Sequence, residues 1–173
     1  MNQLNEFNIN KESFDIKPEI IVSKIINEHS KEIYTEKNML NPYDYDLHCF
    51  DKKKNFLGYI EVEVSNHKRL SGANWQHSFL ARKVLKYDKD KGYVDWELRD
   101  NADKTIYIKF NKYFGLVDCI CCSIESITYF DSDLEYKTGD ERKDLVFRTH
   151  QDNPRVAKGI KKCIEYIERF FEV

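Results

Sequence analysis

The sequence contains no uninterrupted apolar run of the ~18 residues that a membrane-spanning helix needs. Its first ten residues, MNQLNEFNIN, also lack the basic start and the apolar stretch of a secretory signal. Internal repeats, low-complexity segments and linkers rich in Pro, Gly or Ser are absent as well. In a chain of 173 residues, 41% of them hydrophobic, these absences predict one domain covering residues 1–173, a cytoplasmic location and no membrane partner.

Paired cysteine motifs are missing, although the chain has five cysteines. The run Cys119-Ile120-Cys121-Cys122 lacks the two-residue spacer of common zinc sites, and a strand would send Cys122 to the opposite face from Cys119 and Cys121. An odd number of cysteines without a secretory signal argues against a disulfide framework. We therefore expect reduced, buried cysteines that pack as small apolar side chains.

An excess of positive charge is lacking too, because 28 Lys and Arg face 30 Asp and Glu, for a formal net charge of -2. Proteins that bind nucleic acid usually neutralise phosphates with surplus Lys and Arg, so the overall charge does not indicate such a partner. Positive clusters do occur locally, at 52–54, 67–69, 82–83 and 158–162. Taken singly, each is typical of a solvated turn or helix face.

Two segments have the apolar spacing of helices that pack on a core. Residues 18–29, PEIIVSKIINEH, begin with a Pro suited to the first turn and carry Ile and Val at helical intervals. Near the C-terminus, Asn153 supplies a helix cap and Pro154 a first helical position. Apolar residues then recur every three or four positions, which predicts a helix over 156–171 that faces a sheet with Ile160, Ile164 and Ile167.

Between these segments, short β-rich runs separated by polar turns extend from about residue 45 to about residue 130. They are YDLHCF, YIEVEVS, GYVDWEL, TIYIKF and GLVDCICCSI, and LVFRT is a candidate strand after a polar loop at 136–144. The order of helix, sheet and helix predicts an α/β or α+β fold. We expect a mixed, mostly antiparallel twisted sheet flanked by the N-terminal and the C-terminal helix.

Two neighbouring runs carry an unusual concentration of acids. In YIEVEVS, Ile and Val alternate with Glu61 and Glu63, so one face of the strand is apolar and the other holds two carboxylates about 7 Å apart. If YDLHCF pairs with this run through the Lys-rich turn, both apolar sets must cover the core, and Asp46 then joins the two glutamates. A hard divalent cation would relieve the repulsion of such acids, but a solvated strand face explains them as well.

NPYDYDL, followed by a turn and YIEVEVS, resembles the core hairpin of the PD-(D/E)XK nuclease-like superfamily. In that superfamily an Asp early in one strand and a Glu-x-Lys pair on the next bind metal ions and cleave phosphodiester bonds. FLARKVLKY and TIYIKFNKYFGLVDCI are similar to the later part of small phage-type members, in which a basic pair precedes a strand ending in Asn. The resemblance covers about residues 18–122.

The resemblance implies a restriction-endonuclease-like core and a metal-dependent endonuclease. Its Mg²⁺ or Mn²⁺ would be bound by Glu28 of the first helix, Asp46, Glu61 and the Val62 carbonyl, with Asp44 as an alternative to Asp46. Nucleic acid is the implied partner, with DNA favoured over RNA, and the sequence leaves open whether the chain forms a homodimer.

The pattern departs from the superfamily at Glu63, where the motif has Lys. Glu63 would then serve as a further metal ligand or a general base, and Lys83 or Arg82, with Lys68 behind, would supply the positive charge. Two alternatives to catalysis stay open. One is an inactive nuclease-like module that binds nucleic acid or protein, such as a phage accessory protein, and the other is an interaction domain whose acids face solvent.

Overall fold

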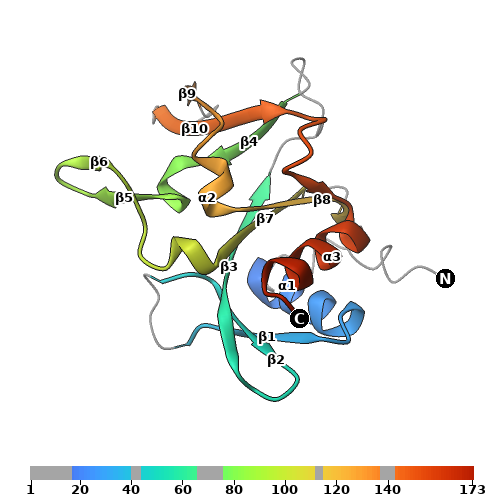
Figure 1. Cartoon of the computed structure of the whole chain (residues 1–173). Coiled ribbons are helices and arrows are strands. Elements are labelled where there is room, and N and C mark those ends of the chain that lie inside the picture. The colour runs from blue at the N-terminus through green and yellow to red at the C-terminus, as the bar shows by residue number, and fades with distance from the viewer. Residues whose placement is uncertain (1–16, 40–43, 66–75, 112–114, 137–142) are drawn as a thin grey trace.

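The central element of the computed structural model is a mixed sheet that connects segments from both halves of the chain (Figure 1). The structure describes residues 17–39, 44–65, 76–111, 115–136 and 143–173. In these residues the sheet has six strands in the order β1 (Ile33–Lys37), β2 (Leu47–Asp51), β3 (Phe56–Ser65), β7 (Thr105–Asn111), β8 (Gly115–Ser123) and β11 (Ala157–Lys158). Only the β3–β7 pair among them is parallel, so the predicted α+β class with a mixed, mostly antiparallel sheet is confirmed.

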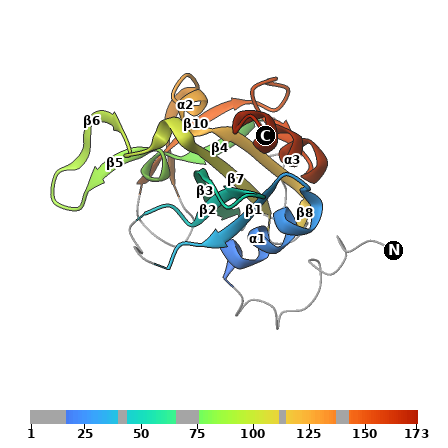
Figure 2. The same cartoon turned by 60° about the horizontal axis from the view of Figure 1, so that its bottom comes forward.

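Helices cover one face of this sheet and a second layer of strands covers part of the other. The helices are α1 (Pro18–His29) and α3 (Ile160–Phe170), which lie near each other in both views (Figures 1 and 2). The second layer contains β4 (Gln76–Leu80), β10 (Lys143–His150), β9 (Asp131–Tyr136) and α2 (Ile124–Ile127). Two short 3₁₀ turns, η3 (Ala81–Lys83) and η4 (Ala102–Lys104), flank an arm formed by β5 (Leu85–Asp88) and β6 (Gly92–Leu98), which projects from the body (Figure 1).

Strand alternation creates two hydrophobic cores, one on each face of the sheet. On the helical face, Ile60 and Ile106 pack with Ile26 of α1 and Ile164 of α3. On the other face, the neighbouring strand residues, such as Tyr107, pack against the second layer. Side chains that alternate with Ile60 and Val62 therefore point into the space between the sheet and the second layer. This is the face that carries the acids of β3.

The N-terminal helix has the predicted bounds, but the C-terminal helix begins later than the sequence indicates. Asn153 caps a turn instead of a helix, since its side chain accepts a hydrogen bond from the Arg155 N–H at 2.9 Å. Residues 157–158 then pair with β8 at the sheet edge, and Gly159, with φ 82°, redirects the chain into α3. The prediction of a helix from residue 156 is thus wrong at its start. Its inward face is confirmed, with Ile164 and Ile167 buried and Ile160 packed beside them.

All five cysteines are buried and free, with Cys119 and Cys121 in one core and Cys122 in the other. The run LVFRT lies in β10, whereas the sequence does not predict strands β1, β4, β5, β9 and β11 or the short helix α2. Lys68 falls outside the described residues. Across the described parts of the chain, the helices are too short or too polar to cross a membrane.

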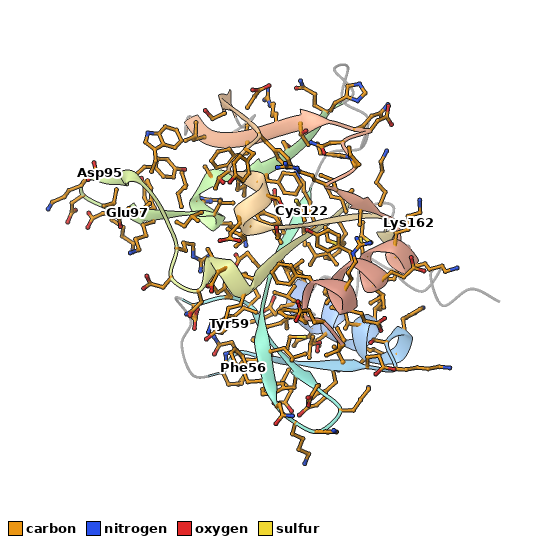
Figure 3. The ribbon with its side chains drawn as sticks, viewed as in Figure 1. Phe56, Tyr59, Asp95, Glu97, Cys122 and Lys162 are labelled. Atoms are coloured by element: carbon orange, nitrogen blue, oxygen red, sulfur yellow. The ribbon has the colours of Figure 1, made fainter. Side chains whose placement is uncertain are left out.

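We expect Ile164→Asp to lower the free energy of unfolding by about 4 kcal/mol, because it leaves an unpaired carboxylate in the core under α3. Lys162→Asp is the matched control, since Lys162 is exposed on the outer side of the same helix (Figure 3). Its effect should stay within about 0.5 kcal/mol. Urea unfolding of both variants measures the difference, and equal effects would contradict the packing of α3.

Candidate functional site

The β2–β3 hairpin brings Asp46 and Glu61 together, as alternation in the two strands predicts. Leu47 pairs with Ile60, so the residue before β2 lies opposite Glu61. Asp46 Oδ2 accepts a hydrogen bond from the Val62 N–H at 2.7 Å, which fixes this carboxylate against β3. Asp44, the alternative, has a local role, because its Oδ1 accepts from the N–H of Tyr45 at 2.8 Å.

Lys83 places its ammonium among the groups that the family resemblance implies as metal ligands. Its Nζ donates to Glu61 Oε1 at 2.5 Å and to the Val62 carbonyl at 2.7 Å, and it lies 3.8 Å from Asp46 Oδ2. Lys83 belongs to η3, whose turn follows β4 of the second layer. Two carboxylates and one carbonyl oxygen from the hairpin therefore converge on a single positively charged atom. We call Asp46, Glu61, Val62, Lys83 and Arg99 the carboxylate cluster.

Arg99, which sequence reasoning missed, approaches Glu61 from the other side. Its Nη1 lies 3.3 Å from Glu61 Oε2 and donates to the Lys83 carbonyl at 3.1 Å. The Glu61 contact is an ion pair without hydrogen-bond geometry, since Oε2 is buried and has no hydrogen-bond partner. The guanidinium stacks 4.1 Å from the centre of the Tyr45 ring. No sequence pattern links position 99 to position 61, because the contact depends on how the β5–β6 arm returns to the sheet.

Glu61 is 5% exposed, so the interpretation of the acids as a solvated strand face is wrong for this residue. Burial raises the pKa of the Glu61 carboxyl. The positive charge of Lys83 opposes this increase, the negative charge of nearby Asp46 adds to it, and Arg99 opposes it again. Two carboxylates and two basic side chains balance formally in the carboxylate cluster. The cluster is therefore buried and compensated by ammonium and guanidinium groups.

Glu63 lies on the same face but has different partners. The Tyr107 hydroxyl donates to Glu63 Oε2, and Lys109 Nζ lies 3.4 Å from Oε1. The same hydroxyl accepts from the Leu80 N–H at 3.2 Å, and Lys109 donates to the Ser78 carbonyl at 2.7 Å. Burial is the largest cause, and the negative charge of Glu63 the second, of a Tyr107 pKa well above its usual value. Glu63 thus connects β3 and β7 to β4, the strand that leads into Lys83.

Glu28 is not brought to the carboxylate cluster. It is exposed on α1, which packs on the opposite face of the sheet, and its carboxylate lies 3.9 Å from Lys24 of the same helix. The other candidate cation, Arg82, is exposed next to Lys83. In the described residues, no three His, Cys, Asp or Glu side chains gather in a group that could hold a metal ion. The oxygen set at Lys83 consists of two carboxylates and a main-chain carbonyl.

Comparison of the chain with models of known protein families, with curated proteins and with solved structures finds no match. The carboxylate cluster and the resemblance of its hairpin to the nuclease-like superfamily are therefore the two indications of a function.

We expect Glu63→Lys to lower the free energy of unfolding by about 3 kcal/mol, because it places a second ammonium beside Lys109 and removes the acceptor of the buried Tyr107 hydroxyl. Combining it with Lys109→Glu restores an opposite-charge pair and should recover a large part of that loss. Urea unfolding of the two single variants and the double variant forms the cycle. Simple additivity would show that positions 63 and 109 do not interact.

Proposed function

We propose that this protein is a metal-dependent phosphodiesterase of the PD-(D/E)XK type that cleaves nucleic acid, with a restriction-endonuclease-like core. One observation carries the proposal: Asp46 Oδ2, Glu61 Oε1 and the Val62 carbonyl surround one cationic atom. These are three of the four groups to which the sequence resemblance assigns the metal. The helix ahead of the hairpin and the helix packed after the sheet agree with the core expected of that superfamily.

The oxygen donors fit a hard divalent cation. Carboxylate and carbonyl oxygens are the ligands that Mg²⁺ accepts, and Mn²⁺ takes the same kind of ligand. Glu61 Oε2 is an additional acceptor, buried without a hydrogen-bond donor. Asp46, Glu61 and the Val62 carbonyl would hold the ion. Glu28 lies on the far side of the sheet and is not part of the proposed site.

The basic residues of the cluster take distinct tasks in this proposal. When bound, Mg²⁺ or Mn²⁺ neutralises a phosphate and lowers the pKa of a water molecule. Lys83 moves out from between the carboxylates and supplies the ammonium that the superfamily motif has at position 63, where it balances negative charge that develops on the phosphate. Arg99 stays against Glu61 and orients its carboxylate.

An inactive nuclease-like module that binds nucleic acid or protein is the second candidate. It is favoured by the same ammonium, because Lys83 already compensates Asp46 and Glu61 where a metal would bind. In that case Lys83 is a permanent internal cation and the cluster stabilises the fold. The two candidates differ in whether a divalent cation displaces Lys83.

Purified protein incubated with single-stranded DNA, duplex DNA and RNA, with Mn²⁺ or with EDTA, tests the proposal. We expect cleavage of at least one substrate with Mn²⁺ only, together with a rise in the thermal unfolding temperature on Mn²⁺ addition. A catalytically inactive module predicts neither cleavage nor a metal-dependent stability shift. Cleavage that continues in EDTA would contradict the metal-dependent mechanism.

A further inference from the structure

Ring side chains gather on the open end of the sheet face that carries Glu61. Cross-strand pairing aligns Tyr34 with Phe50, His48 with Tyr59, and Phe50 with Phe56. We call this group the aromatic patch; it consists of Tyr34, His48, Phe50, Phe56 and Tyr59. Phe56 is 44% exposed and the other four are partly exposed. Figure 3 shows Phe56 and Tyr59 on the same side of β3.

Ring contacts continue from the patch to the carboxylate cluster. The centroids of Phe56 and Tyr59 are 5.1 Å apart, and those of Tyr59 and Tyr45 are 5.3 Å apart. Arg99 stacks on Tyr45 and pairs with Glu61. Tyr59 is two positions before Glu61 on β3, so both side chains leave the strand on the same face. Tyr45 itself is buried, but the side chains of Asp46 and Lys83 are 31% and 23% exposed. A strand lying on the patch would therefore have the accessible part of the carboxylate cluster beside it.

The chemistry of the patch favours bases over phosphates. Aromatic rings stack on bases of any sequence, whereas a duplex hides its base faces and presents phosphates, which require Lys and Arg. The patch itself is built from rings, and acidic Glu36 lies across from His48 on β1. The hairpin turn next to the patch carries three exposed lysines, Lys52, Lys53 and Lys54. A chain with a net charge of -2 can bind a nucleic acid in this way without a large basic surface.

We propose that the aromatic patch binds unpaired bases and guides a single-stranded segment of nucleic acid to the carboxylate cluster. The hairpin lysines contact the phosphates of the same strand. This inference deepens the proposed function and rests on it, because it names single-stranded nucleic acid as the substrate class. A protein partner or a second copy of this chain would use the exposed ring surface for apolar packing, and the experiment below separates these occupants.

Binding of a short fluorescein-labelled oligothymidylate in EDTA, followed by fluorescence anisotropy, tests the patch without cleavage. Phe56→Ala should weaken binding about ten-fold, since it removes an exposed ring on which one base can stack. Phe56→Trp keeps a stacking surface and should bind as the wild type does. Tyr129→Ala is the matched control, because Tyr129 is an exposed ring of the second layer, 78% accessible and outside the patch. An unlabelled duplex should compete less well than the single strand.

The outcomes separate this inference from the proposed function. Weaker binding by Phe56→Ala alone supports the patch even if the wild type cleaves no substrate, which would overturn only the proposed function. Cleavage by the wild type together with unchanged binding by Phe56→Ala would overturn only the patch. Duplex binding equal to single-strand binding also overturns it. The patch proposal would also be overturned if the wild type formed a dimer in sedimentation, Phe56→Ala dissociated that dimer, and neither protein bound the oligonucleotide.

Discussion

Glu61→Gln is expected to reduce metal-dependent cleavage by about 10³-fold or more. The substitution preserves the shape of the side chain but removes one of the two carboxylates that converge at Lys83. Charge neutralisation by a bound cation contributes several kcal/mol to the transition state, and each 1.36 kcal/mol corresponds to a factor of ten in rate. The rise in unfolding temperature on Mn²⁺ addition should disappear in the same variant.

The stability of this variant distinguishes a lost ligand from a lost fold. Because the pKa of Glu61 is raised by burial, the folded protein holds that proton more tightly than the unfolded chain does. The wild type therefore loses stability as the pH rises from the ordinary pKa of Glu to the raised value, whereas Glu61→Gln does not. At neutral pH without metal, the variant should be at least as stable as the wild type. Undiminished cleavage by Glu61→Gln would eliminate the carboxylate cluster as the active site.

Local sequence patterns are sufficient to predict the parts of the candidate site that lie on one hairpin. The two-residue period of strands places Asp46 and Glu61 opposite each other whenever both apolar sets face the core. The same period correctly puts Glu63 on their face. It does not say what covers that face, so the spacing alone also fits a solvated surface, whereas in the structure Glu61 is buried beneath the second layer.

Local sequence patterns cannot predict contacts between segments that are distant in the chain. The partners of Glu63 come from β7, whose parallel pairing with β3 requires a long crossover that no local pattern specifies. Arg99 reaches Glu61 because the β5–β6 arm returns to the sheet beside Lys83. The C-terminal helix shows a related effect: the cap signal at Asn153 is typical of a helix start, but pairing of β11 with β8 takes precedence over it.

Lys83→Met is expected to lower the free energy of unfolding by about 3 kcal/mol in the absence of metal. The substitution keeps most of the aliphatic stem but removes the ammonium that contacts Glu61, the Val62 carbonyl and Asp46. Removal of one partner leaves a buried carboxylate less compensated, which is strongly destabilising in proteins. Arg99 remains against Glu61 and limits the loss. Lys86 on neighbouring β5 provides the control, because its side chain is 40% exposed and forms a surface ion pair with Glu97. Lys86→Met should change the free energy of unfolding by no more than about 0.5 kcal/mol.

Metal addition should then affect Lys83→Met more than the wild type. In the wild type a divalent cation must displace the ammonium from the two carboxylates, whereas in the variant it meets them uncompensated and binds more tightly. Mn²⁺ should therefore raise the unfolding temperature of Lys83→Met by more than that of the wild type, while cleavage falls because the ammonium that balances the phosphate is gone. Thermal unfolding with and without Mn²⁺, measured beside Lys86→Met, gives the comparison. Full cleavage activity in Lys83→Met would exclude Lys83 as the lysine of the active site. If Mn²⁺ raised the unfolding temperature of Lys83→Met by less than that of the wild type, Asp46, Glu61 and the Val62 carbonyl would not form a metal site.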